Sequence, residues 1–142
     1  MIQQISVFLE NRAGQLLQLT DLMAKNNINL QALLVADNSD YGVIRMITDD
    51  SHKTYAILKD KGYIAHVTPV TAVAVDDKPG TLNSILSAVA EEGVNLEYMY
   101  SLFGKADGKA YMLLKTDCPE SLDAHLAARS FTVIDGKALG IA

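Results

Sequence analysis

The sequence predicts an α+β protein made of two copies of one module, whose elements follow in the order β-α-β-β-α-β. Three observations support this prediction. A strand–loop–helix motif returns after 66 residues (80 − 14, between its two glycines), the strand and helix periodicities alternate in the same order in both halves, and the first helices end on residues that suit a left-handed turn. The 142 residues suffice for two small domains, predicted over residues 1–69 and 70–142. Domains this small bury little surface alone, so they are expected to share an interface.

The repeat is centred on Gly14 and Gly80, which follow Asn11-Arg12-Ala13 and Asp77-Lys78-Pro79 respectively. The same offset aligns Val7 with Val73, Leu16 with Leu82, Ala24 with Ala90, Asn29 with Asn95 and Leu30 with Leu96. Further along the chain the offset becomes 68 (116 − 48), which pairs Thr48 with Thr116, and a longer hairpin at residues 104–108 explains the change. Chance rarely keeps residue type and register over so long a stretch, so the sequence indicates a duplication.

Each element of the module has its own pattern. Runs rich in β-branched residues predict first strands over 5–10 and 71–75. Apolar stripes at helical spacing predict the first helices. They consist of Leu16, Leu19 and Met23 in one copy and of Leu82, Ile85, Leu86 and Val89 in the other. Asn27 and Gly93 are predicted to end these helices in the left-handed conformation. The remaining predictions are second strands over 29–36 and 95–103, turns over 37–40 and 105–108, return strands over 41–48 and 109–116, second helices over 51–61 and 119–129, and final strands over 63–67 and 131–135.

This order of elements is the ferredoxin-like one, an antiparallel sheet with both helices on one face. The predicted link between the copies is only Thr68-Pro69-Val70 and contains no flexible glycine–serine stretch. Because the tether is so short, the two sheets are predicted to pair side by side into one sheet.

Composition excludes several classes of function. The net charge is −5 and the 12 basic residues are scattered, which disfavours binding to nucleic acid or an anionic membrane. Cys118 is the single cysteine, so an intrachain disulfide and a thiolate metal cluster are excluded. Neither a signal peptide nor a membrane span is evident, which predicts a cytoplasmic protein. The three histidines lack metal-ligand spacing, and no cofactor is expected.

The strand–helix loops carry the most informative chemistry. A glycine that opens a helix exposes backbone N–H groups, which together with the helix dipole favour a carboxylate or phosphate. Asn11 and Asp77 can accept a hydrogen bond from an ammonium group, and the amides of Asn29 and Asn95 can both donate and accept. An α-amino acid carries both charges on one carbon. A purely structural interpretation stays open, in which Asn11 and Asp77 cap their helices and the other two asparagines shape turns.

Both copies resemble ACT domains, and the whole chain resembles stand-alone tandem ACT proteins. The resemblance lies in Glu10-Asn11-Arg12-Ala13-Gly14 with Asn27-Ile28-Asn29-Leu30, and in Asp76-Asp77-Lys78-Pro79-Gly80 with Gly93-Val94-Asn95-Leu96. It implies ferredoxin-like modules that bind amino acids at domain–domain interfaces and often control metabolic enzymes. In serine-binding members an asparagine of the loop and one that opens the second strand contact the ligand. These positions map onto Asn11 and Asn29, and onto Asp77 and Asn95, where Asp77 departs from the amide.

The predicted function is a regulatory module that binds a free amino acid and has no catalytic activity, acting either in trans on a metabolic enzyme or as a small ligand sensor. A small enzyme and an RNA-binding ferredoxin-like protein are the alternatives, but no nucleophile–base pair is present and the central strands are mostly aliphatic. A homodimer is expected because sheet edges or helix faces still need cover. The predicted ligand-binding residues are Asn11, Arg12, Ala13, Gly14, Gln15, Leu16, Asn29 and Leu30, and Asp77, Lys78, Pro79, Gly80, Thr81, Leu82, Asn95, Leu96 and Tyr98.

The first copy is predicted to hold the stronger site, built from Asn11 and Asn29 and completed by residues 95–100 of the other half. Asp77 attracts an ammonium group but repels a carboxylate a few ångströms away, and it is expected to cap its helix. The sequence does not name the amino acid or the partner protein.

Overall fold

The computed structural model describes residues 1–37, 41–103 and 107–141. The chain divides into two compact units: Gln3–Thr68 with the last residues from Gly140 on, and Pro69–Leu139 with Met1–Ile2. We call them the first and the second half. Met1 also contacts the second half through its ammonium group, which lies 2.7 Å from the Asp123 carboxylate. This carboxylate accepts a hydrogen bond from the Thr71 hydroxyl at 2.6 Å. The predicted turns at 37–40 and 105–108 lie partly outside the described residues.

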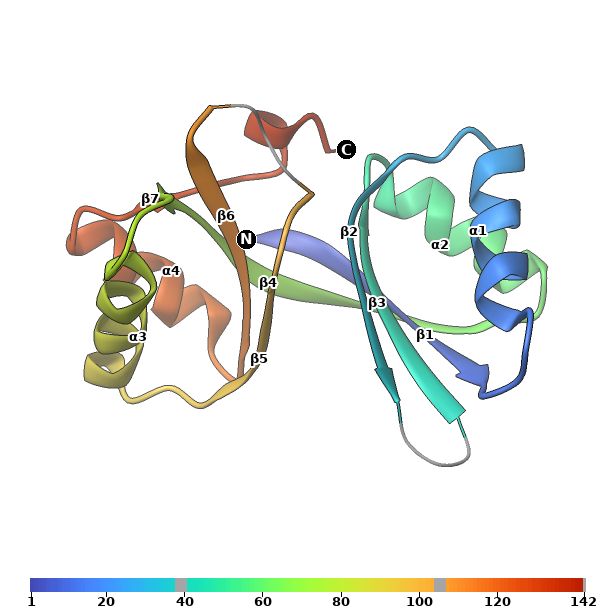
Figure 1. Ribbon diagram of the computed structural model, residues 1–142, viewed down its shortest axis with the longest axis horizontal. Coiled ribbons are helices and arrows are strands. Elements are labelled where there is room, and N and C mark those ends of the chain that lie inside the picture. Colours follow the sequence, from blue (N-terminus) through green and yellow to red (C-terminus); the bar gives the residue numbers. More distant parts are fainter. Residues whose placement is uncertain (38–40, 104–106, 142) are drawn as a thin grey trace. The chain divides into compact units, whose positions relative to one another are not determined.

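The first half contains β1 (Ile2–Glu10), α1 (Gln15–Lys25), β2 (Leu30–Asp37), β3 (Tyr41–Thr48), α2 (Ser51–Asp60) and the first part of β4 (Ile64–Asp76). Its strand order is β2-β3-β1-β4, and both β1 and β2 pair with β3 in antiparallel orientation. Helices α1 and α2 lie on the same face of these strands (Figure 1).

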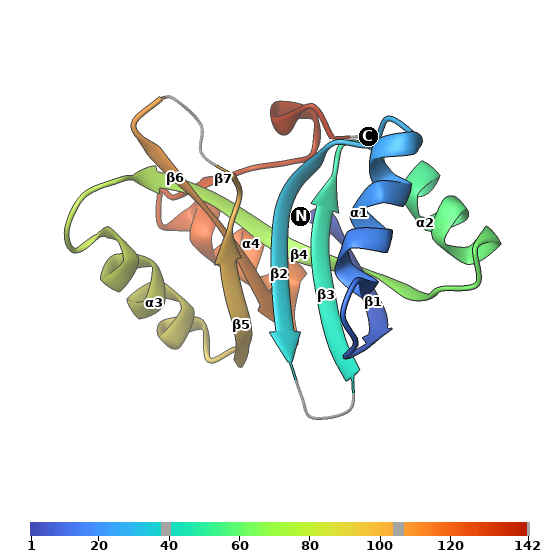
Figure 2. The same ribbon diagram turned by 45° about the vertical axis from the view of Figure 1, so that its right-hand side comes forward.

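The second half repeats this arrangement with the second part of β4, α3 (Thr81–Glu92), β5 (Leu96–Ser101), β6 (Lys109–Thr116), α4 (Pro119–Ala128) and β7 (Thr132–Val133), followed by a short 3-10 helix (Lys137–Leu139). Its strand order is β5-β6-β4-β7, with antiparallel pairs throughout. Figure 2 shows α3 and α4 on one face of this sheet. The βαββαβ order predicted for each copy is confirmed.

The prediction of two separate strands where the copies join is wrong. The final strand of the first copy, the link at 68–70 and the first strand of the second copy form a single strand, β4, of 13 residues. Val67, Thr68, Val70 and Thr71 favour extended backbone, and the fixed φ of Pro69 is compatible with it. No glycine interrupts the run, so the strand continues. The side-by-side pairing of the two sheets stays a prediction.

Each half has its own core between sheet and helices. In the first half β1 contributes Ile5, Val7 and Leu9, and in the second half α4 contributes Leu122 and Leu126, all of them buried. Each such side chain stabilises the fold by about 1.5–3 kcal/mol. Leu19, Met23, Ile85 and Val89 are buried as the helical stripes predicted. Leu16 and Leu82 were expected in the same stripes, but they lie in the first turn of their helices and are 37% and 47% exposed.

The helix ends follow the sequence closely. Asn27 and Gly93 have φ of 53° and 76°, so the left-handed turns predicted there are confirmed. Asp50 caps α2 by accepting a hydrogen bond from the Lys53 N–H at 2.9 Å, and Pro119 opens α4. The strands β5 and β7 are shorter than predicted, since they end at Ser101 and Val133.

Candidate functional site

The loops before α1 and α3 have the same backbone. The Arg12 N–H donates to the Glu10 carbonyl at 2.9 Å, and the Lys78 N–H donates to the Asp76 carbonyl at 3.0 Å. Gly14 and Gly80 then take the left-handed conformation, with φ of 84° and 90°. The duplication seen in the sequence therefore extends to the dihedral angles of these loops.

The glycines, and not Asn11 or Asp77, occupy the N-cap positions. Gly14 caps α1, Gly80 caps α3, and neither helix start has a side-chain cap hydrogen bond. The prediction that Asp77 caps its helix is therefore wrong.

Backbone N–H groups in the first turn of a helix have no intrahelical partner. The Gln15 and Thr81 N–H groups donate to the Arg12 and Lys78 carbonyls at 3.3 and 3.4 Å. No side chain caps the N–H groups that follow in the first turn, so these are available to an anion.

A cavity of about 140 Å³ opens at the loop of the first half. It contains four of the predicted site residues, Asn11, Arg12, Gln15 and Leu16, and adds Leu9, Glu10, Val35, Gly42 and Ile44. The sequence did not single out the last five for binding. Glu10 is part of the repeated motif, so the sequence alone could have indicated it. Val35, Gly42 and Ile44 reach the loop only through strand pairing.

The charges at this cavity belong to an exposed ion pair. The Arg12 Nε atom lies 2.7 Å from the Glu10 Oε2 atom, and both side chains are about two-thirds exposed, at 66% and 68%. Exposed pairs of this kind contribute about 0–1 kcal/mol. A ligand that offers either group a better partner therefore displaces the pair at little cost.

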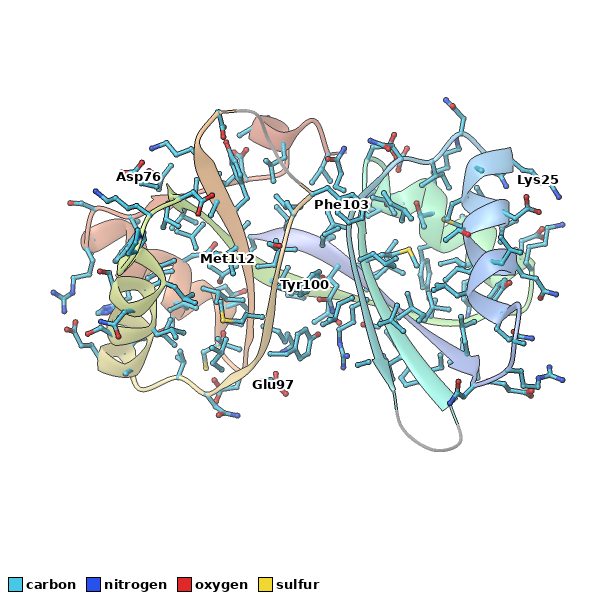
Figure 3. The ribbon with its side chains drawn as sticks, viewed as in Figure 1. Lys25, Asp76, Glu97, Tyr100, Phe103 and Met112 are labelled. Atoms are coloured by element: carbon cyan, nitrogen blue, oxygen red, sulfur yellow. The ribbon has the colours of Figure 1, made fainter. Side chains whose placement is uncertain are left out.

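The second half arranges its charges differently. Lys109 of β6 lies across from Asp76 of β4, and its Nζ atom donates to Asp76 Oδ1 at 2.6 Å. This hydrogen bond lowers the pKa of Asp76 and raises the pKa of Lys109. Asp76 lies where β4 ends (Figure 3), and the N–H of the following residue, Asp77, donates to the Gly108 carbonyl at 3.1 Å.

A cavity of about 230 Å³ lies beside the Asp76–Lys109 pair. Its lining includes Thr81, Ser130 and Phe131. Of the residues predicted to bind a ligand in the second copy, Thr81 is the one that reaches it, and the exposed Asp77 side chain does not.

Asn29 and Asn95 lie far from the loops of their own halves. Glu10 pairs with Tyr41 at one end of β3, whereas Leu30 pairs with Thr48 at the other end. Seven residue steps along a strand span about 23 Å. The structure therefore does not bring Asn11 and Asn29 together within the first half.

The strand starts have a structural role that the repeat also preserves. The Asn29 N–H donates to Asp49 Oδ1, and the Asn95 N–H donates to Asp117 Oδ1, both at 3.0 Å. Both strands then carry a register shift, between Leu30 and Ala32 and between Leu96 and Tyr98. Leu30 and Leu96 pack against the cores of their halves, and the ring of Tyr98 lies 6.4 Å from that of Tyr100.

The described part of the chain contains no group of three or more metal-ligating side chains. Cys118 is a free, exposed thiol. None of the described helices is both long and apolar enough to cross a membrane.

Solved structures resemble this one over nearly the whole chain. Protein BT0572 from Bacteroides thetaiotaomicron is similar with a TM-score of 0.90 and 33% identity, over 98% of this chain and 95% of that chain. The ligand-free regulatory subunit of aspartate kinase from Thermus thermophilus is similar with a TM-score of 0.66 and 14% identity, over 89% and 91% of the two chains. The corresponding subunit from Thermus flavus gives 0.61 and 15%, over 89% and 90%. At these identities the two subunits show a shared fold.

No curated protein matches the chain. The family model of the ACT domain pair matches residues 1–140. The ferredoxin-like order of elements in each half and the duplicated strand–helix loops agree with that match. The chain therefore belongs to the family of ACT domain pairs.

Proposed function

We propose that the first half binds a free α-amino acid at the cavity beside Asn11, and that the chain is a regulatory module without catalytic activity. The observation that carries this proposal is the cavity itself, which contains hydrogen-bonding, charged and apolar groups in one small space. The fold shared with regulatory subunits of aspartate kinase supports a regulatory role.

The polar lining fits the two charges of an amino acid. The start of α1, where Gln15 and Leu16 line the cavity, offers first-turn N–H groups without a side-chain cap and the positive end of a helix dipole to the ligand carboxylate. The Glu10 carboxylate attracts the ligand ammonium group, and the Asn11 amide bonds to either. Arg12 gives up its exposed ion pair with Glu10 and forms an ion pair with the ligand carboxylate instead.

The apolar lining and the volume limit the ligand's side chain. Leu9, Leu16, Val35 and Ile44 surround the cavity. Its volume of about 140 Å³ lies below the roughly 300–1,000 Å³ of pockets for drug-sized molecules. We therefore expect a small, uncharged side chain.

A screen of the twenty amino acids by thermal shift tests the proposal. Saturation at a hundredfold excess over the dissociation constant stabilises the fold by roughly 2.7 kcal/mol. For a chain of this length that corresponds to a rise in melting temperature of about 5–10 °C. If no amino acid raises the melting temperature at millimolar concentration, the proposal is wrong.

A reciprocal exchange locates the site. Asn11→Asp gives the first loop the charge of the second and is expected to weaken binding of the ligand that the screen finds. Asp77→Asn makes the opposite change at an exposed, matched position and serves as the control. If Asp77→Asn changes the affinity and Asn11→Asp does not, the site lies in the second half.

We further place this module in the cytoplasm, acting in trans on a metabolic enzyme. The free, exposed Cys118 suits a reducing compartment. Capture of an enzyme from cell extract that depends on the identified amino acid tests the second point. The involvement of residues 95–100 in the same site stays a prediction.

A further inference from the structure

Both halves carry a groove on their helices at matching positions. In the first half a groove of about 450 Å³ is lined by Gln18, Asp21, Leu22, Lys25, Lys61 and Tyr63. In the second half a groove of about 310 Å³ is lined, among others, by Ser84, Ser87, Ala88, Glu91, Arg129 and Phe131. The repeat offsets of 66 and 68 place these six residues at the positions of the first six. The shape of the groove therefore follows from the module.

The chemistry of the two grooves is different. In the second half Arg129, which follows α4, forms an ion pair with Glu91 of α3. The same two positions of the first half hold Lys61 and Lys25, which repel each other. Lys25 pairs with Asp21 at 2.7 Å along its own helix. Within the described residues, the Lys61 ammonium has neither a hydrogen bond nor an ion pair.

The difference in charge extends over the whole helix layer of each half. We define a helix layer as the two helices of one half together with the residue that caps the second helix at its C-terminus. In the first half Lys25, Lys53, Lys59 and Lys61 face two acids, Asp21 and Asp60, an excess of two positive charges. In the second half Arg129 is the one arginine or lysine of the layer, against the acids Glu91, Glu92, Glu120 and Asp123. The Met1 ammonium group lies 2.7 Å from Asp123, which leaves an excess of two negative charges. Lys25 projects from the end of α1 away from the strands (Figure 3).

We propose that the basic helix layer of the first half is a docking surface for the acidic helix layer of the second half of another copy of this chain. Charge complementarity supports this partner, since the basic layer stands on a chain whose net charge is −5. The acidic layer has the same order of elements, and its helices of 12 and 10 residues are similar in length to the 11- and 10-residue helices of the basic layer.

The size of the surface predicts how strong the association is. Helices of ten to twelve residues are about 15–18 Å long, and two side by side are about 20 Å wide, which gives roughly 300 Å² per layer. Stable complexes bury about 800 Å² on each partner. The association is therefore expected to be reversible, to depend on protein concentration and to weaken with salt.

Sedimentation of the full chain over a concentration series tests the proposal. At about 20 mM salt we expect a dimer or larger assembly near 100 µM protein, and about 0.5 M salt is expected to dissociate it. Lys61→Glu is expected to raise the dissociation constant about tenfold, because it places a like charge against the acidic layer. Lys137→Glu changes the net charge equally outside the helix layers and is expected to change it less than twofold.

Compensation gives the decisive result. Glu120 forms no ion pair within the described residues, so Glu120→Lys breaks no intrachain ion pair. In the double variant with Lys61→Glu, the new lysine of the acidic layer attracts the new glutamate of the basic layer. The double variant is therefore expected to regain the native dissociation constant. A monomer at every concentration overturns the proposal, as does an assembly that salt does not weaken. Equal effects of Lys61→Glu and Lys137→Glu also overturn it. If the double variant changes the melting temperature of a monomer, the two layers attract each other within one chain, and this outcome contradicts the proposal as well.

Discussion

The strand–helix loops of the two halves share one backbone but use their charges differently. In the first half Glu10 pairs with Arg12 inside the loop, at the edge of a small cavity. In the second half the matching Asp76 pairs with Lys109 across two strands. The comparison shows that the duplicated backbone gives both helices a glycine start without a side-chain cap, while the residues beside it set a different charge arrangement in each half.

The largest expected effect concerns binding at the first loop. Asn11→Ala removes a hydrogen bond to a charged group, which costs about 1.5–3 kcal/mol. The affinity for the amino acid is then expected to fall roughly ten- to a hundredfold. Calorimetric titration measures the change, and Asp77→Ala in the second loop is the matched control. Loss of binding in Asp77→Ala alone would reverse the assignment of the two loops.

A smaller effect is expected at the two glycines. Gly14→Ala and Gly80→Ala force a left-handed conformation on a residue with a Cβ atom, which costs about 1–2 kcal/mol each. No atom lies within 4 Å of either added Cβ, so the cost is conformational rather than steric. Chemical denaturation of both variants measures the free energy of unfolding. Unequal losses would show that the two helix starts are not equivalent.

Asp77→Ala is expected to change stability by about 0.5 kcal/mol or less, as exposed substitutions usually do. The sequence alone predicted a larger loss through a missing cap, but Gly80 occupies the cap position and α3 has no side-chain cap hydrogen bond. Asp50→Ala, which removes the side-chain cap of α2, is the positive control and is expected to cost about 1 kcal/mol. Equal losses in the two variants would restore the capping role of Asp77.

The smallest expected effect is a pH dependence of the second loop. The hydrogen bond from Lys109 lowers the pKa of Asp76 from its ordinary value of 3.8. A carboxyl group whose pKa is lowered by folding stabilises the protein above its unfolded pKa, and this contribution is lost as pH falls through the folded pKa. Lys109→Met is therefore expected to lower stability at neutral pH and to flatten its decline below about pH 4. Unfolding free energies measured from neutral to acidic pH check this, and an unchanged slope would contradict it.

Much of the fold was predictable because it depends on local patterns. The apolar periodicity of α1 and α3, the left-handed turns at Asn27 and Gly93, and the cap at Asp50 each depend on a few neighbouring residues. The repeat then fixed the order of elements in the second half once the first was known. These features are dictated by backbone dihedrals and side-chain spacing, which a single segment of sequence contains.

The candidate site was predictable only in part, and for a physical reason. Asn11, Arg12, Gln15 and Leu16 reach one cavity because they follow each other along one loop and helix start. Whether Asn29 lies near these residues depends on how β1 and β2 pair with β3. The pairing places the start of β2, next to Asn29, at the end of β3 that is far from the Asn11 loop.

The tertiary structure alone decided which distant side chains meet. Strand pairing brings Val35, Gly42 and Ile44 to the Asn11 loop, and it places Lys109 against Asp76. Helix packing sets Glu91 against Arg129. The sequence by itself determined two βαββαβ modules with glycine-opened helices, because propensity and periodicity act within a segment. Strand register and helix packing decided the neighbours of each loop, because they depend on contacts between segments that are far apart in the chain.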